Sequence, residues 1–524
     1  MSQNFFSALV YPKFVTEIDA LKNSLYSVIP SVFCYTSSQV LSRLIQRLVE
    51  IGLVPYVQKS SQASKIDSIS RWEDEIELGP IKLNIHSGTS SLRFIFLLKS
   101  VAEFWLHWFH ALYAIFVAFL ASKREQNSAT LIFGVGIESI FHEQSDLRFY
   151  EFCQQGPISP LKPTSKLIVQ ANTQTRSRLP SKIEYSRFPL FSLLRINSLN
   201  VSEFLKLLAI HTKVAAYYFA AITRLPLLAV IGRDFAYHAV ADNLNRRGLI
   251  NSIVITNSNY SAQPLWMNNL PNKVFKTHMV WYAQNTVPIV YKDKPIKAVI
   301  PNYLYMQADE HWVWTKGYAE YLRGLGTVGE IHVVGPIVWQ LPNLAEIESN
   351  DANEVVISIF DVTPVNDSFA QELGLYGNYY NAENMINFID QIMLVVDRIQ
   401  LKIEGNIRVL LKHKRGHHSR HSQEYIARIN DYIESCQIAI VPFNENVYKV
   451  VAQSAMVIVV PYSSPAYIAD ALNIPAIFFD PTGRVFPTYE QSKNLKFISS
   501  DIELERYILS VLGALEKRAP LECH

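Results

Sequence analysis

The chain has 524 residues, of which 49% are hydrophobic and 18% are charged. This length and composition exclude disorder as the main state and allow two or more hydrophobic cores. The 48 basic and 46 acidic residues give a net charge near +2, so no overall field favours nucleic acid and any basic site must be local.

The cysteines and the first residues favour a location in the cytoplasm. Cys34, Cys153, Cys436 and Cys523 are scattered, without the close pairs of a zinc site. Unpaired cysteines are typical of a reducing compartment. Residues 1–6 show no basic segment followed by an apolar core, so we expect no secretion signal and a cytoplasmic protein.

The first predicted unit is a strand followed by an amphipathic helix. Residues 31–35 form a short apolar run, and apolar residues then recur at helical spacing from Val40 to Val49. Residues 53–57 are predicted to form the next strand. The pattern favours a nucleotide-binding-like α/β unit, although its loop lacks the Gly-x-Gly-x-x-Gly fingerprint.

The most apolar stretch, residues 92–121, predicts one long helix. It is long enough to cross a bilayer, which needs roughly 20 apolar residues. Lys99, Glu103, His107 and His110 nevertheless share one side of this helix, and a lipid-exposed span rarely carries such a stripe. We interpret the stretch as a helix packed in a soluble domain. The alternatives are a helix at the membrane surface and a true span.

The rest of the first half alternates apolar runs with polar loops. The run at residues 131–134 ends in a glycine loop with Glu138 just beyond it, and the run at 227–231 is read as a strand that leads to Gly-Arg-Asp234 and a helix. Strands are also predicted at residues 252–256 and 277–282. These elements predict a first Rossmann-like domain with insertions over residues 1–345.

From Val355 the alternation is more regular. Strands are predicted at residues 355–360, 407–412, 438–441, 457–460 and 474–479, separated by helices that include residues 382–401 and 423–435. Strands that alternate with helices predict a parallel doubly wound sheet, and hence a second Rossmann-like domain over residues 346–500. Residues 501–524 hold a last helix and a tail, which we expect to cross back to the first domain.

Two loops of the second domain carry groups suited to an anion. The segment from Lys412 to His421 holds four cations and four histidines in ten positions, and Pro461-Tyr-Ser-Ser464 precedes a helix whose N–H groups are unpaired. Both loops follow predicted strands, so they lie on the same edge of the sheet. The alternatives are a solvated basic turn and an ordinary capped helix.

These loops resemble those of a known family. A Lys-His-Lys loop combined with Pro461-Tyr-Ser-Ser464 and the downstream residues 471–481 is similar to bacterial polysaccharide biosynthesis proteins named for a Pro-Phe-Thr-Ser motif. More distantly, the chain resembles glycosyltransferases that use CMP-sugars, such as sialyl- and Kdo-transferases, and CDP-glycerol glycerophosphotransferases. Residues 278–285, 333–339 and 360–364 extend the resemblance.

The resemblance implies a metal-independent GT-B enzyme, with two Rossmann-like domains, a deep cleft between them and no cofactor. The residues that it places at the donor nucleotide or its phosphate are Lys412, His413, Arg415, Ser463, Ser464, Asp361 and Thr363. No Asp-x-Asp motif for a divalent cation is present, and we expect no metal. His413 is followed by lysine where the CMP-sugar enzymes have proline, which leaves the donor class open.

An inverting transferase needs a base that takes the proton of the acceptor hydroxyl. Asp234 is the first choice, Glu138 the second and His278 the third. Each has a structural alternative, and for Asp234 this is the cap of the helix that follows it.

The sequence therefore predicts a glycosyltransferase of surface polysaccharide (capsule or O-antigen) biosynthesis. Its expected partners are a CMP-linked nonulosonic acid or Kdo donor and a glycan or lipid-linked glycan acceptor. In the surface-helix alternative, residues 92–121 would make a peripheral contact with the inner face of the cytoplasmic membrane. The alternatives are a phosphotransferase that uses a CDP-polyol, and a noncatalytic component of a polysaccharide assembly complex.

Overall fold

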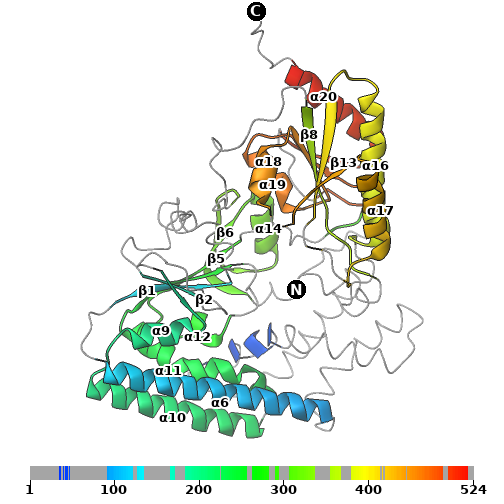
Figure 1. Ribbon diagram of the computed structural model, residues 1–524. Coiled ribbons are helices and arrows are strands. Elements are labelled where there is room, and N and C mark those ends of the chain that lie inside the picture. The colour runs from blue at the N-terminus through cyan, green and yellow to red at the C-terminus, as the bar shows by residue number, and fades with distance from the viewer. Residues whose placement is uncertain are drawn as a thin grey trace, which may run out of the picture.

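The computed structural model describes residues 35–36, 39–40, 42–44, 46–47, 91–121, 127–134, 166–170, 183–224, 226–256, 263–281, 289–293, 306–336, 354–366, 379–413, 416, 419–443, 445–487 and 494–516. These residues form two α/β domains, each built on its own parallel sheet (Figure 1). The strand expected at residues 53–57, Glu138 and Arg415 lie outside the described residues.

The N-terminal sheet has seven parallel strands in the order β3-β2-β1-β4-β5-β6-β7. Their bounds are β1 (Ala129–Phe133), β2 (Lys166–Gln170), β3 (Ile183–Ser186), β4 (Ile250–Thr256), β5 (Lys276–Val280), β6 (Gln307–Val313) and β7 (Val328–Val333). The strand order reverses between β1 and β4. Here the Thr256 hydroxyl donates a hydrogen bond of 2.5 Å to the Gly134 carbonyl, which joins the ends of the two strands.

Helices cover this sheet in two layers (Figure 1). The elements are α6 (Ser91–Leu120), α9 (Pro189–Arg195), α10 (Val201–Arg224), the 3₁₀ helix η1 (Pro226–Ile231), α11 (Gly232–Arg246), α12 (Leu265–Asn268) and α14 (Lys316–Gly324). A common core joins α9, α11, α12 and α14 to one face of the strands, through side chains such as Leu131, Ile253 and Met279. Helices α6 and α10 pack against α11 and each other as the outer layer.

The prediction of a strand at residues 227–231 is wrong, because these residues form η1 and lead directly into α11. Residues 228–231 of this run are buried where η1 packs against α6 and α10, instead of being paired in a sheet. A short apolar run has no periodicity that separates a strand from a buried helical turn. Gly232 permits the close packing, since a Cβ there would lie 2.6 Å from the Tyr218 hydroxyl oxygen and 3.0 Å from the Phe104 Cβ.

The long helix predicted at residues 92–121 is confirmed as α6. The middle of its polar stripe faces the domain: His107 Nδ1 lies 3.2 Å from the Tyr237 hydroxyl, and Glu103 lies 3.9 Å from both Arg47 and His107. Lys99, at one end of the stripe, is exposed. Burial lowers the pKa of His107 to about 3, with the charge of Arg233 adding to the effect. The inner side of α6 thus packs as in a soluble domain.

By length and composition, α6 and α10 are the two described helices that could cross a membrane. Only 33% of the apolar window of α6 and 28% of that of α10 are buried. The outer side of α6 exposes large apolar side chains. They are Leu98, Leu106, Phe109, Tyr113, Phe116 and Leu120.

The C-terminal sheet has six parallel strands in the order β10-β9-β8-β11-β12-β13. Its elements are β8 (Glu354–Phe360), α16 (Ala382–Gln400), β9 (Asn406–Lys412), α17 (Gln423–Glu434), β10 (Ala439–Val441), α18 (Val447–Ala452), β11 (Met456–Val459), α19 (Ser464–Ala471), β12 (Ala476–Phe479), β13 (Leu495–Ile498) and α20 (Asp501–Glu516). Numbered within each domain, the first six strands of both sheets have the order 3-2-1-4-5-6 of the dinucleotide-binding fold. The fold class predicted from the sequence, two Rossmann-like domains of GT-B type, is confirmed.

Helix α20 packs on α16 within the C-terminal domain, where Arg398 pairs with Asp501 at 2.7 Å. The expectation that residues 501–524 cross back to the first domain stays a prediction. The expected boundary at residue 345 lies outside the described residues.

The described domains are joined by a short antiparallel contact, in which Tyr291 pairs with Val485. The Lys292 amide donates to the Arg484 carbonyl at 2.9 Å, and the Phe486 amide donates to the Val290 carbonyl at 2.7 Å. We call residues 290–292 and 484–486 the interdomain tie.

Candidate functional site

The strand order of the C-terminal sheet reverses between β8 and β11, and ligands of open α/β sheets bind at such a point. Phe360 at the end of β8 pairs with Lys412 on one side and with Val459 on the other. Neighbouring strands lie about 4.8 Å apart. The residues that follow these three strands are therefore neighbours along one edge, as the sequence predicts.

Asp361 follows β8 and is fully buried. Its Oδ2 lies 3.0 Å from His413 Nδ1 and accepts a hydrogen bond of 2.5 Å from the Tyr425 hydroxyl. Burial raises the pKa of Tyr425 well above its usual value, and the charge of Asp361 raises it further, so Tyr425 remains a donor. A carboxylate on Nδ1 selects the tautomer that carries its proton there, and it leaves Nε2 on the opposite side of the ring.

Asp361 has capacity for a further hydrogen bond. The Thr363 hydroxyl lies 3.4 Å from the same Oδ2, whereas Oδ1 is buried and has no partner among the described residues. An unpaired buried carboxylate oxygen is uncommon and is typical of a functional site.

Lys412 is turned away from this group. It is buried, and its ammonium donates a hydrogen bond of 2.8 Å to the Phe443 carbonyl, in the loop after β10. Burial lowers the pKa of Lys412. The structure thus ties Lys412 to a neighbouring loop, and its contact with a phosphate remains a prediction.

The loop after β11 ends at α19. Ser463 is the N-cap residue, Ser464 is the first helical residue and Pro465 is the second, so the helix begins one residue earlier than the sequence predicts. The Ser463 side chain makes no capping hydrogen bond, although a serine N-cap usually does. The first turn of α19 thus begins shortly after β11, one of the two strands at the switch point of the sheet, and a helix N-terminus favours an anion.

Tyr462 has a φ of 64°, in the left-handed region that non-glycine residues rarely occupy. Its hydroxyl donates to the Phe486 carbonyl at 2.7 Å. Such strained residues cluster at functional loops. The loop is therefore held in one conformation, and it is linked directly to the interdomain tie.

In the N-terminal domain, Asp234 lies in the first turn of α11, at the carboxyl edge of the sheet, because α11 runs back to the start of β4. It is 3% exposed. Its Oδ2 accepts hydrogen bonds from Arg43 Nε at 2.8 Å and from the Leu265 amide at 2.9 Å. The N-cap of α11 is Ile231, so Asp234 is not the cap but a link between three elements.

His278 lies in the middle of β5, within the strand predicted at residues 277–282. It is buried, and its Nδ1 lies 3.1 Å from Glu310 Oε2 on β6. Burial lowers the pKa of His278 despite the opposing charge of Glu310, so the imidazole is neutral at pH 7. The catalytic roles expected of Asp234 and His278 remain predictions.

The sequence did not single out Tyr425. It lies in α17, 64 residues from Asp361, among apolar positions that read as an ordinary core face. The only feature of the sequence that links Tyr425 to the site is its position shortly after the Lys412–His421 loop.

Two Rossmann-like domains, each with its own parallel sheet and switch point, define an α/β protein of the two-domain GT-B type. The sequence profile of the polysaccharide biosynthesis PFTS motif proteins matches residues 213–508. The chain belongs to this family. The segment that resembles the Pro-Phe-Thr-Ser motif of the family, Pro461-Tyr-Ser-Ser464, lies in the loop that follows β11.

No curated protein matches the chain. Among solved structures, the wall teichoic acid polymerase TagF is similar at 13% identity and a TM-score of 0.40, over 81% of this chain and 88% of that one. A glycosyltransferase from Rickettsia africae is similar at 10% identity and a TM-score of 0.35, over 74% and 89%. The glycosylation-associated Gap123 complex from Streptococcus agalactiae follows at 11% identity and 0.31, over 55% and 54%. Likeness at this level carries no functional argument.

Proposed function

We propose that this protein is a glycosyltransferase of surface polysaccharide biosynthesis that uses a CMP-linked sugar, a nonulosonic acid or Kdo. The observation that carries the proposal is the position of the Asp361–His413 pair and of the Ser463 N-cap, on adjacent strand ends at the switch point of the C-terminal sheet. Membership in a polysaccharide biosynthesis family supports the acceptor class, a glycan or lipid-linked glycan.

The proposed roles follow from the chemistry of each group. The N–H groups of α19 and the Ser463 and Ser464 hydroxyls hold the donor phosphate, because a helix N-terminus favours anions. His413 contacts the same phosphate through Nε2, while Asp361 and Tyr425 fix the orientation of its ring.

In the reaction, the acceptor hydroxyl oxygen attacks the anomeric carbon and the bond from this carbon to the phosphate oxygen breaks. The nucleotide leaves as CMP with the electron pair of that bond. A base takes the hydroxyl proton, with Asp234, Glu138 and His278 as the candidates in that order. The groups at the switch point stabilise the charge that develops on the leaving phosphate.

A thermal-shift titration of the full chain with CMP, CDP, UDP and GDP tests this proposal. CMP and CDP are expected to raise the melting temperature, and His413→Ala and Ser463→Ala are expected to abolish the shift. Ser510→Ala, far from this edge on α20, is the matched control. A preference for UDP or GDP would overturn the CMP assignment, and no shift with any nucleotide would favour a noncatalytic assembly component.

A second candidate function, transfer of a polyol phosphate from a CDP-polyol, uses the same leaving group, CMP. It differs in the atom attacked, which is phosphorus instead of an anomeric carbon. Incubation with each donor and an acceptor glycan, followed by mass spectrometry of the acceptor, separates the two, since only one adds phosphorus.

We further propose that α6 and α10 place the enzyme on the inner face of the cytoplasmic membrane. The exposed side of α6 is a stripe of Leu, Phe and Tyr, and Lys99, Lys206 and Lys213 are exposed on the two helices. The described acidic residues of these helices, Glu103 and Glu203, are partly buried and face Arg47 and Arg247. An apolar stripe flanked by lysines suits an anionic lipid surface.

A further inference from the structure

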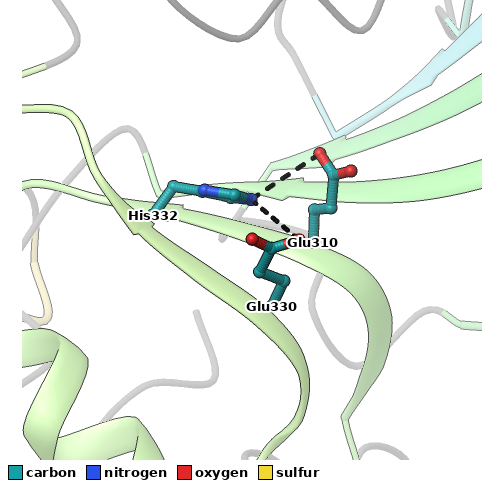
Figure 2. Close-up of side chains that lie close together, drawn as sticks. All are labelled: Glu310, Glu330 and His332. Carbon is teal, nitrogen blue, oxygen red and sulfur yellow. Dashed lines mark ion pairs between the residues drawn. The ribbon is translucent and has the colours of Figure 1, made fainter.

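Three side chains on the last two strands of the N-terminal sheet converge on one point (Figure 2). Glu310 on β6 pairs in register with Glu330 on β7, and Trp312 pairs with His332. Since alternate residues of a strand share a face, Glu310, Glu330 and His332 project from the same face of the sheet. This is also the face of His278 on β5.

His332 Nε2 lies between the two carboxylates without a hydrogen bond. The atom is buried, and it is 4.0 Å from Glu310 Oε2 and 3.7 Å from Glu330 Oε2. Both distances are too long for a hydrogen bond. Buried polar atoms in proteins are usually bonded to a partner. A bound group that contacts the ring nitrogen and both carboxylates would supply the missing partner.

The cluster also has an unbalanced charge. The Lys276 ammonium donates to Glu310 Oε1 at 2.6 Å and neutralises one of the two carboxylates. Among the described residues, no lysine or arginine lies within ion-pair distance of Glu330, so the negative charge of this carboxylate has no basic partner. A divalent cation would compensate this charge, and both oxygens and the imidazole are metal ligands.

We propose that Glu310, Glu330 and His332 bind a divalent transition-metal ion, with Zn²⁺ the best match. Imidazole with two carboxylates suits zinc better than Ca²⁺ or Mg²⁺, which take oxygen ligands alone. Donors on a tetrahedral zinc ion at about 2.1 Å lie roughly 3.4 Å from each other. The distances of 3.7 and 4.0 Å from His332 Nε2 therefore need to shorten by about half an ångström, which requires rotation of the partly exposed His332 ring and of the largely exposed Glu330 side chain.

This ion would hold the edge of the sheet together. β7 is the outermost strand, most of its residues are exposed, and it is the last strand before the chain passes to the second domain. A metal that bridges β6 and β7 would fix the edge strand and keep it from pairing with another chain. The site joins the two outermost strands at one edge of the N-terminal sheet, so the role that we propose for the ion is structural.

Isothermal titration of the chelator-treated full chain with ZnCl₂ tests the site. We expect one tight equivalent and a rise of several degrees in melting temperature. Glu330→Gln and His332→Ala should weaken this binding at least tenfold. Glu320→Gln, an exposed carboxylate of α14, is the matched control and should bind as the unchanged protein does.

A second control addresses the histidines of the Lys412–His421 loop. The double variant His417→Ala/His418→Ala should retain the tight equivalent. Zinc binding that is lost in this double variant, or that persists unchanged in Glu330→Gln and His332→Ala, would overturn the proposal. Absence of binding to the unchanged protein would do so as well. Circular dichroism confirms that each variant is folded.

Discussion

The carboxylate of Asp361 and the imidazole of His413 are 3.0 Å apart, although 52 residues separate them in the chain. Because β8 and β9 are adjacent and parallel, their ends bring the two residues together. The carboxylate selects one tautomer of the histidine. We therefore propose that Asp361 acts as a positioning residue for His413, and its direct contact with the donor stays a prediction.

Asp361→Asn should lower the affinity for CMP by about tenfold, the lower end of effects for residues that orient a ligand. An asparagine amide can donate to Nδ1 and thereby move the histidine proton to Nε2. Tyr425→Phe removes the other hydrogen bond to Asp361 and should have a smaller effect. Calorimetric titration with CMP measures both. Equal affinity in Asp361→Asn and the unchanged protein would contradict the positioning role.

Asp234→Asn separates a structural role from a catalytic one. An asparagine oxygen can still accept from Arg43 and from the Leu265 amide, so the melting temperature should fall by only a few degrees. If Asp234 is the base, turnover should fall by about 100-fold or more while CMP still binds. Undiminished turnover would remove Asp234 from the mechanism.

The apolar stripe of α6 predicts binding to anionic vesicles. Phe109→Ser combined with Phe116→Ser should shift the protein from the pellet to the supernatant in vesicle sedimentation, since a buried Phe contributes about 1.5–3 kcal/mol. Leu401→Ser, an exposed apolar residue of the C-terminal domain, is the control. Sedimentation that survives the double change would argue against this surface.

Buried neutral histidines predict acid sensitivity. The pKa of His107 is about 3, and those of His211, His238 and His311 are about 4, chiefly because of burial. These values lie below the 6.5 of an unfolded histidine, so the unfolded chain takes up more protons and stability falls as the pH falls below 6.5. Each contributes a loss of about 1.4 kcal/mol at pH 5.5. The melting temperature should therefore be lower at pH 5.5 than at 7.5, and His107→Gln should reduce the difference.

Gly232→Ala should destabilise the N-terminal domain by about 1–3 kcal/mol, because the new Cβ overlaps the ring of Tyr218 and the Cβ of Phe104. Gly324→Ala in α14 is the matched control, since no atom lies within 4 Å of a Cβ there. Thermal unfolding measures both. Equal melting temperatures for the two variants would show that α6 and α10 can move apart at no cost.

The C-terminal domain follows closely from sequence because its buried parallel strands are continuous apolar runs between helices of clear 3.6-residue period. The prediction failed at residues 227–231, where an apolar run of the same kind is buried among helices instead of strands. Periodicity over five residues does not distinguish these two environments.

The candidate site was predicted in part. The strand ends that carry Asp361, His413 and Ser463 follow from the parallel topology. The sequence pattern around Lys412 does not determine the direction of its long side chain. The hydrogen bond from its ammonium to the Phe443 carbonyl was therefore not expected. Tyr425 and the Glu310–Glu330–His332 cluster depend on contacts across helices and strands, which a single sequence does not reveal.

The interdomain tie gives the two domains a second point of attachment besides the covalent connection after β7. Buried side chains of both domains, such as Trp312 and Tyr462, also belong to one apolar cluster. The Tyr462 hydroxyl is bonded to the Phe486 carbonyl, so the strained loop before α19 takes part in both of these contacts between the domains. A change at Tyr462 would therefore reach the loop before α19 and the interdomain tie together.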